Sequence, residues 1–295
     1  MSAARMSLST LPAVSPRRRR TDRIMRGLLV LATAVALVPL VLVIYYLLKK
    51  GLSSWTSGGF FSSDPNGNFF GNPGGIRSAI FGSLEIVGLA TAIAVPTGIA
   101  VALYLTEYGR ESRFADVVRY FVDVMTGVPS IVFGLFIYIV LVIAKVGGAF
   151  TGWKASLAVA LLMLPIVVRS AEVVLLLVPS SLREAALALG APRWRVIARV
   201  VLPTSVSGLT TGSLLAVARG MGETAPLLFT VSTAFALTGN LSHQMNTLPV
   251  QIYTDIQSPR NAIEARAWGA GLTLVALVLI FNLIARLISS RSRMA

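Results

Sequence analysis

The chain has 295 residues, of which 55% are hydrophobic and 13% are charged, whereas about 25% of the residues in a soluble domain are charged. This composition argues against a water-soluble globular enzyme. Lys and Arg outnumber Asp and Glu by 26 to 12, an excess that by itself suggests a nucleic acid or another anionic surface as partner. Because the chain has no cysteine and one histidine, it can form neither a disulfide nor a multi-histidine metal centre.

The apolar residues are gathered into six blocks, each long enough to cross a bilayer, for which about 20 residues are needed. Continuous apolar runs of this length predict helices, because an open sheet cannot exist in hydrocarbon and a barrel strand alternates apolar and polar residues. We therefore predict an all-α integral membrane protein whose six-transmembrane-helix domain covers 27–289. The approximate spans are 27–48, 80–105, 121–144, 155–178, 204–233 and 267–288.

The basic residues that flank these spans predict the orientation of the chain. Seventeen of the 26 fall on one side of the predicted membrane, seven on the other and two inside spans, and basic residues favour the cytoplasmic side. A basic N-terminal arm (1–26) and a C-terminal tail (290–295) are therefore expected in the cytoplasm. Topology then explains the positive charge, with the four arginines of 17–20 beside anionic lipid, and we expect no nucleic-acid partner.

An alternative for the first block is a secretory signal that is removed from the mature protein. The block is longer than the roughly 7–15 apolar residues of such signals, and no small-x-small cleavage site follows it. We favour a retained first helix.

Two long segments, 51–75 and 234–266, fall on the side opposite the cytoplasm. The first is rich in Gly, Ser and Asn, which predicts an irregular loop whose aromatic side chains lie near the lipid headgroups. These side chains are Trp55, Phe60, Phe61, Phe69 and Phe70. The second holds His243 and is uncharged from 234 to 254, so part of it is a candidate for re-entry into the membrane. We interpret His243 as an ordinary solvated side chain.

The cytoplasmic stretch 179–203 contains the most specific motif. Helix-forming residues from 182 to 189 end at Gly190, which suits a helix C-cap, and Pro192 prevents simple continuation, so a short helix, a turn and a second helix are predicted. By composition alone this is a basic interfacial helix. The spacing, however, resembles the signature of type I ABC importer permeases. The matching residues are Glu184, Ala185, Ala186, Gly190, Leu202 and Pro203, with Val200 where that signature has isoleucine.

This resemblance implies a MetI-like six-helix permease in which the short helix is a cytoplasmic coupling helix that seats on an ATPase subunit. The small Ala185 and Ala186 would permit close approach, while Glu184 and arginines such as Arg193 would supply polar contacts at the rim. Gly190 would end the coupling helix.

Further motifs narrow the resemblance to the phosphate permeases PstA and PstC. The run Gly-Val-Pro-Ser-Ile-Val-Phe-Gly-Leu at 127–135 is similar to a motif of that pair, and Met-Gly-Glu-Thr-Ala-Pro-Leu-Leu at 221–228 is similar to PstA, as are 164–169 and 248–253. The resemblance covers most of 74–253. It implies a permease subunit of an inorganic phosphate importer in the bacterial inner membrane. The implied partners are a PstC-like permease, two copies of a PstB-like ATPase and a PstS-like phosphate-binding protein.

Energy for transport must come from a partner. The dipeptide Gly-Lys does not occur, so the chain lacks a phosphate-binding loop of the Walker type, and ATP and Mg are expected on the partner ATPase, with no cofactor in this chain. An intramembrane enzyme using Glu223 or His243 is disfavoured, because these residues lack an evident nucleophile or metal site. The remaining alternatives are a permease for another oxyanion, such as sulfate or molybdate, and a membrane scaffold for phosphate signalling.

Two of the predicted spans each carry a pair of charged side chains: Arg169 and Glu172 in 155–178, and Arg219 and Glu223 in 204–233. Each would cost about 2.5–3.5 kcal/mol near a helix centre, so we expect them to face the bundle interior. Their i,i+3 and i,i+4 spacings allow two self-contained structural ion pairs. They also allow an anion pathway, since the guanidinium fork suits phosphate oxygens and keeps its proton when desolvated. We favour the pathway and keep the ion pairs as the alternative.

Small residues recur at every fourth position before Arg219. They are Gly208, Gly212, Ala216 and Gly220. Such a ridge lets a neighbouring helix approach closely, so we expect it to pack inside the permease core.

Overall fold

A computed structural model of the chain describes residues 16–66, 71–232 and 234–291. These residues form helices joined by loops, which confirms the predicted all-α class. The helices are α1 (Pro16–Trp55), α2 (Arg77–Leu103), α3 (Arg113–Gly127), α4 (Ser130–Ile137), α5 (Gly152–Leu176), α6 (Ser180–Ala188), α7 (Arg193–Val196), α8 (Leu202–Gly222), α9 (Ala225–Leu228), α10 (Leu248–Ile256) and α11 (Asn261–Arg291). Short π-helical segments continue α2 (Tyr104–Tyr108) and α4 (Tyr138–Val142) and join α7 to α8 (Ile197–Val201).

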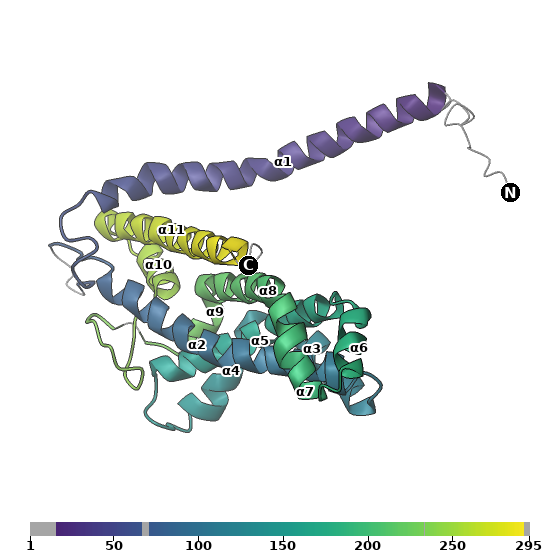
Figure 1. Cartoon of the computed structure of the whole chain (residues 1–295). Coiled ribbons are helices and arrows are strands. Elements are labelled where there is room, and N and C mark those ends of the chain that lie inside the picture. The colour runs from purple at the N-terminus through teal and green to yellow at the C-terminus, as the bar shows by residue number, and fades with distance from the viewer. Residues whose placement is uncertain (1–15, 67–70, 233, 292–295) are drawn as a thin grey trace. The chain divides into compact units, whose positions relative to one another are not determined.

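The chain divides into two compact units, residues 1–49 and 50–295. The described part of the first unit is 16–49 of helix α1, where all the apolar side chains except that of Leu47 are exposed. In the second unit α5 is central, packed against α2, α3, α4 and α8, while α11 packs against α8 and α10 (Figure 1). Most of the buried side chains around α5 are Ala, Val, Leu and Met. This core fixes the helices that carry the charged residues.

Within the part of the chain that the structure describes, five helices are long and apolar enough to cross a membrane: Pro16–Trp55, Arg77–Tyr108, Gly152–Leu176, Arg193–Gly222 and Asn261–Ile284. A sixth candidate is the pair α3 and α4 with its π-helical extension, which is bent by 103°. The predicted third span, 121–144, is therefore not one helix. Val128 is extended (φ −72°, ψ 129°), because a residue that precedes a proline disfavours the helical conformation.

The predicted fifth span, 204–233, is also interrupted. Helix α8 ends at Gly222, Glu223 is extended (ψ 126°), and the short α9 follows after Thr224. Pro226 lies in the first turn of α9, where its missing N–H removes no helical hydrogen bond. Glu223 therefore caps α8 instead of lying within it.

The predicted ridge of small residues packs on α5. A Cβ added at Gly208 would lie 2.6 Å from Val174 Cγ1, and one added at Gly212 would lie 2.5 Å from Ser170 Oγ. At Gly220 the nearest atom would be Met163 Sδ, at 2.8 Å. Residue numbers increase along the ridge of α8 while those of the contacted residues decrease along α5. The two helices are therefore antiparallel and in close contact. The expected close packing is confirmed.

Gly134 of α4 touches the backbone of α9, and this contact joins two of the motifs found in the sequence. A Cβ at Gly134 would lie 2.5 Å from Pro226 Cα and 2.7 Å from its carbonyl oxygen. Gly134→Ala is expected to destabilise the protein by about 1–3 kcal/mol, because neither backbone can yield cheaply. Thermal unfolding of the purified protein measures this loss. Gly222→Ala is the matched control, since nothing lies within 4 Å of its added Cβ; an equal drop in both variants would contradict the interpretation.

The loop after α1 is more ordered than its composition suggested. Phe60 is buried against Ile76, Ala79 and Ala270, and Trp55 Nε1 donates to the Gly269 carbonyl and Thr273 Oγ1. Phe60 is therefore buried within the protein and Trp55 is partly buried, while the position of the aromatic side chains near the headgroups stays a prediction. Phe61 is exposed, and Phe69 and Phe70 lie outside the described residues.

Asp64 ties this loop to two other parts of the chain. Its carboxylate accepts two hydrogen bonds from Arg77, at 3.1 and 2.8 Å, and one from the backbone N–H of Leu237. The hydrogen bonds from Arg77 hold the pKa of Asp64 below its ordinary value. This contact is therefore at full strength above about pH 4, the unfolded pKa, and is lost as the pH falls through the lower folded pKa.

We expect the unfolding midpoint of the wild-type protein to fall between about pH 5 and pH 3 more steeply than that of Asp64→Asn. The asparagine cannot gain a proton in this range, so the variant lacks this contribution to the slope. Arg77→Gln, which removes the donor, should flatten the profile in the same way. Thermal melts across the pH series test this, and parallel profiles for all three proteins would refute it.

Candidate functional site

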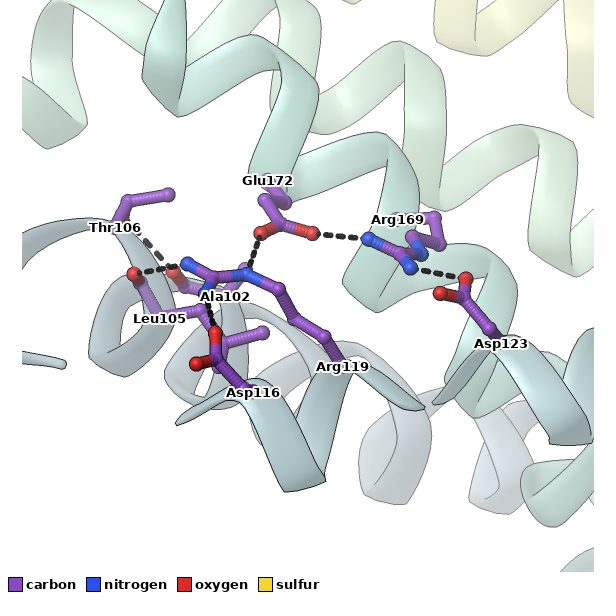
Figure 2. A network of polar contacts seen from close by, with 8 residues as sticks. All are labelled: Ala102, Leu105, Thr106, Asp116, Arg119, Asp123, Arg169 and Glu172. Carbon is purple, nitrogen blue, oxygen red and sulfur yellow. Dashed lines mark hydrogen bonds and ion pairs between the residues drawn. The ribbon is translucent and has the colours of Figure 1, made fainter. Parts of the chain in front are cut away.

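The first intramembrane pair belongs to a larger network between α3 and α5 (Figure 2). Arg169 donates to Glu172 Oε2 at 2.7 Å and also to Asp123. The other oxygen of Glu172 accepts from Arg119 Nε at 2.9 Å. Arg119 donates in addition to Asp116 at 3.1 Å and to the carbonyl of Leu105 at 2.9 Å. We call Asp116, Arg119, Asp123, Arg169 and Glu172 the α3–α5 network.

The predicted Arg169–Glu172 pair is thus present, but it is not self-contained. The α3–α5 network holds three carboxylates and two guanidinium groups, so its formal charge is −1. The side chain of Glu172 is buried at its centre, 7% exposed, and its charge is compensated by arginines on both sides. Two nitrogens of Arg169 already bind carboxylates, which leaves this arginine a poor free site for an anion.

Sequence reasoning missed the α3 members of this network. Arg119 is one of the basic residues that the sequence places on the cytoplasmic side, and Asp123 lies near the start of the predicted span 121–144. The available signal was the spacing of Asp116, Arg119 and Asp123, which places all three on one helical face at i, i+3 and i+7. Only the fold shows that this face meets α5.

The second pair has a different environment. Arg219 Nη2 lies 3.3 Å from Glu223 Oε1, and the Arg219 side chain is 57% exposed whereas that of Glu223 is 15% exposed. Arg219 also lines a cavity of about 160 Å³. The other lining residues are Met125, Thr126, Val128, Phe133, Leu162, Pro165 and Ile166. Arg219 is therefore the intramembrane arginine that adjoins open space.

The Arg169–Glu172 pair and the cavity beside Arg219 lie about one helical turn apart along α3 and α5. Thr126 lines the cavity of Arg219, and Asp123, one turn earlier on α3, binds Arg169. On α5, Pro165 and Ile166 line the cavity one turn before Arg169. The break between α3 and α4 supplies Val128 to the cavity wall. The fold thus brings all four predicted pathway residues to the region where α3, α5 and α8 meet.

The predicted coupling segment folds as a short helix and a turn. Gly190 has φ +78°, and the N–H groups of Gly190 and Ala191 bond to the carbonyls of Leu187 and Ala186 at 2.9 and 3.2 Å. This pair of bonds is the Schellman pattern that ends helices at a left-handed glycine, as the sequence predicted. Arg193 then begins α7.

Glu184, Ala185 and Arg193 are exposed, so they are available to a partner. Ala186 is different, because its methyl group packs against a buried cluster that includes Val178 and Leu209. Ala186 is therefore partly covered by the protein itself, and its contact with an ATPase subunit stays a prediction.

Within the described residues, no group of three or more His, Cys, Asp or Glu side chains is arranged to hold a metal ion. His243 lies in the loop before α10, where its backbone carbonyl accepts from the N–H of Gly152 at 3.1 Å.

Comparison with known proteins identifies the family. The family model described as "Binding-protein-dependent transport system inner membrane component" matches residues 94–294. The phosphate transport system permease protein PstA of Haemophilus influenzae is 40% identical over 270 residues, which cover 92% of this chain and 94% of the relative. PstA 1 of Mycobacterium tuberculosis (strain H37Rv) is 40% identical over 274 residues, covering 92% and 88%.

Solved structures support the same fold. A bacterial alginate ABC transporter, crystallised with an alginate-bound periplasmic protein, superposes with a TM-score of 0.64 at 15% identity and covers 92% of this chain and 96% of its own. The inward-facing MetNI methionine ABC transporter gives a TM-score of 0.55 at 17% identity, covering 74% and 94%. These likenesses show the MetI-like ABC permease fold. The chain is thus a transport component of the inner membrane, and it belongs to the PstA family of phosphate transport system permease proteins.

Proposed function

We propose that this chain is the permease subunit of an ATP-driven inorganic phosphate importer and forms the translocation pathway with a homologous PstC-like permease. The observation that carries the proposal is the 40% identity with PstA proteins over more than nine-tenths of the chain. The cargo agrees with the chemistry of the candidate site, because Arg219 offers a permanently charged donor fork beside a cavity lined by four helices, α3, α4, α5 and α8.

In this proposal Arg219 contacts the phosphate directly. Among the described residues its one carboxylate partner is Glu223, 3.3 Å away, and the Arg219 side chain is still 57% exposed. Glu223 also weakens anion binding, since a passing phosphate must share the arginine with a fixed negative charge. A transport site needs binding that is favourable enough to enter and weak enough to leave, and this pairing supplies both.

In the proposed pathway Arg169 has a different role from Arg219, because it holds two helices together. Its guanidinium binds both Asp123 of α3 and Glu172 of α5. It therefore fixes two of the helices that line the cavity beside Arg219. The negative charge of the α3–α5 network discourages an anion from resting there. Arg169 thus lines the pathway as a structural ion pair and leaves the stronger anion contact to Arg219.

Hydrolysis of ATP belongs to two copies of a PstB-like ATPase, which would bind the nucleotide and Mg. The exposed Glu184 and Ala185 of α6 and the exposed Arg193 after Gly190 are the contacts we assign to that subunit. A PstS-like receptor would deliver phosphate on the other face of the membrane. Both termini lie in the cytoplasm in this arrangement, in accordance with the basic residues on that side.

The test is reconstitution of the four-component complex in vesicles. Phosphate-loaded receptor should stimulate ATP hydrolysis and import of labelled phosphate, whereas sulfate and molybdate should do neither. Stimulation by one of those oxyanions in place of phosphate would establish the alternative cargo. A deletion that spares phosphate uptake but alters the cellular phosphate response would instead favour a signalling scaffold.

A further inference from the structure

One side chain of the short helix α6 turns into the protein and binds two other helices. Arg183 Nε and Nη2 donate to Glu107 Oε1 at 3.1 and 2.9 Å. Its Nη1 donates to the carbonyl of Val178 at 2.6 Å, and Nη2 also to the carbonyl of Leu175 at 2.8 Å. The side chains of Arg183 and Glu107 are 19% and 12% exposed. This guanidinium is therefore a largely desolvated junction with three acceptor groups.

Helix α6 has few other attachments to the core. None of its residues is fully buried, and apart from Arg183 only Ala186 is partly buried. The methyl group of Ala186 contributes packing but no directional contact. The hydrogen bonds of Arg183 are thus the side-chain hydrogen bonds that hold α6 to the end of α5, in addition to the short link 177–179 and the packing of α6 on α7 and on Ile197–Val201.

The acceptors of Arg183 lie next to the α3–α5 network. Leu175 is one turn beyond Glu172 on α5, so its carbonyl belongs to the same rigid helix. Glu107 lies in the π-helical segment after α2, and Leu105 of that segment accepts from Arg119 of the network. Arg183 and the α3–α5 network therefore bind the same two elements, the end of α5 and the segment Tyr104–Tyr108. Their contacts on α5 are about one helical turn apart.

We propose that Arg183, with Glu107 as its counter-ion, is the positioning residue that transmits displacement of α6 to α5 and to the end of α2. This inference rests on the proposed function, in which an ATPase moves α6. A push on α6 moves the Arg183 fork, and the fork moves the carbonyl end of α5 together with Glu172. Without this fork, ATP turnover displaces α6 while α5 and the pathway residues stay in place.

The geometry requires arginine in particular. Four N–H groups of one planar fork reach three oxygens that lie in different directions. A lysine ammonium is a single point charge on a flexible stem and cannot hold the same oxygens rigidly. Cationic donors also suit the last carbonyls of a helix such as α5. Lysine at 183 should therefore restore part of the coupling and glutamine none.

The first experiment measures phosphate imported per ATP hydrolysed in vesicles that contain the complete complex. We expect Arg183→Gln and Glu107→Gln to lower this ratio at least tenfold while ATP hydrolysis continues, and Arg183→Lys to recover part of it. Arg195→Gln is the control, because Arg195 is exposed in α7 and its guanidinium lies over the Trp194 ring. An unchanged ratio, with import and hydrolysis lost in parallel, would show that Arg183 serves only folding and would overturn the proposal.

A second experiment does not depend on the cargo. The chain has no cysteine, so spin labels can be attached to cysteines that replace the exposed Val173 of α5 and the exposed Leu189, which caps the C-terminus of α6. The distance between the labels should stay constant between nucleotide states in the otherwise unchanged protein and should vary once Arg183→Gln is added. If the distance varies equally in both, the link is wrong. A wild-type complex that shows a constant distance but imports no phosphate would overturn the proposed cargo and leave the link standing.

Discussion

Arg219→Ala should reduce uptake of labelled phosphate at least tenfold while the complex still assembles at its normal yield. Hydrogen bonds to a charged partner are worth about 1.5–3 kcal/mol each, which corresponds to a tenfold effect or more when one is lost. Assembly should survive because the Arg219 side chain is 57% exposed and its one carboxylate partner sits at the end of α8. Uptake in vesicles and the yield of the co-purified subunits measure the two quantities separately.

Arg113→Ala is the matched control for this variant, since it removes an exposed arginine at the start of α3, away from the cavity. Arg169→Ala should behave differently from both. It leaves Asp123 without its arginine and Glu172 with Arg119 alone, so we expect a loss of stability of about 1–3 kcal/mol in addition to lost uptake. Normal uptake by Arg219→Ala would remove Arg219 from the pathway.

Arg266→Ala should be the most destabilising of the ion-pair substitutions. Arg266 and Asp255 form a two-pronged pair at 2.8 and 2.7 Å, and both side chains are at most 7% exposed. Arg266 also donates to the carbonyl of Pro73. Removing one partner leaves a buried charge without compensation, which costs about 3–5 kcal/mol. Thermal unfolding of the purified complex measures the loss.

The pair Lys50–Glu264 provides the control, because it joins neighbouring segments but both side chains are more than one-third exposed. Water screens such a pair, so Lys50→Ala should lower the unfolding midpoint far less than Arg266→Ala. Asp255→Ala should resemble Arg266→Ala, and the double variant should cost less than the sum of the two, since no charge is then left alone. Additive losses would mean that the pair does not act as a unit.

The sequence predicted the parts of the fold that depend on hydrophobicity and local chemistry. Continuous apolar blocks gave the long helices, small residues at every fourth position gave the face of α8 that meets α5, and Gly190 gave the end of α6. Each of these follows from residues that are close in sequence. The spacing of the family motifs then fixed the fold class, and comparison with PstA proteins confirmed the family.

The sequence could not predict which distant charges meet. Asp123 and Arg169 are 46 positions apart, and Glu107 and Arg183 are 76 apart, so only tertiary packing pairs them. Lys154 illustrates the same limit. It directly precedes the predicted span 155–178, but its side chain is fully buried and its ammonium donates to the carbonyls of Leu141, Gly148 and Ala149.

The charges at the two ends of the α3–α5 network are more exposed than the charge at its centre. Salt should therefore weaken the end contacts more than the central ones. The side chains of Asp116 and Asp123, at its two ends, are 74% and 58% exposed, whereas Glu172 at its centre is 7% exposed. Dissolved ions screen exposed charges over about 8 Å at physiological salt but act little on buried pairs. Concentrated salt should therefore loosen the two ends while both arginines stay bound to Glu172, so that α3 gains freedom to pivot about a fixed point on α5.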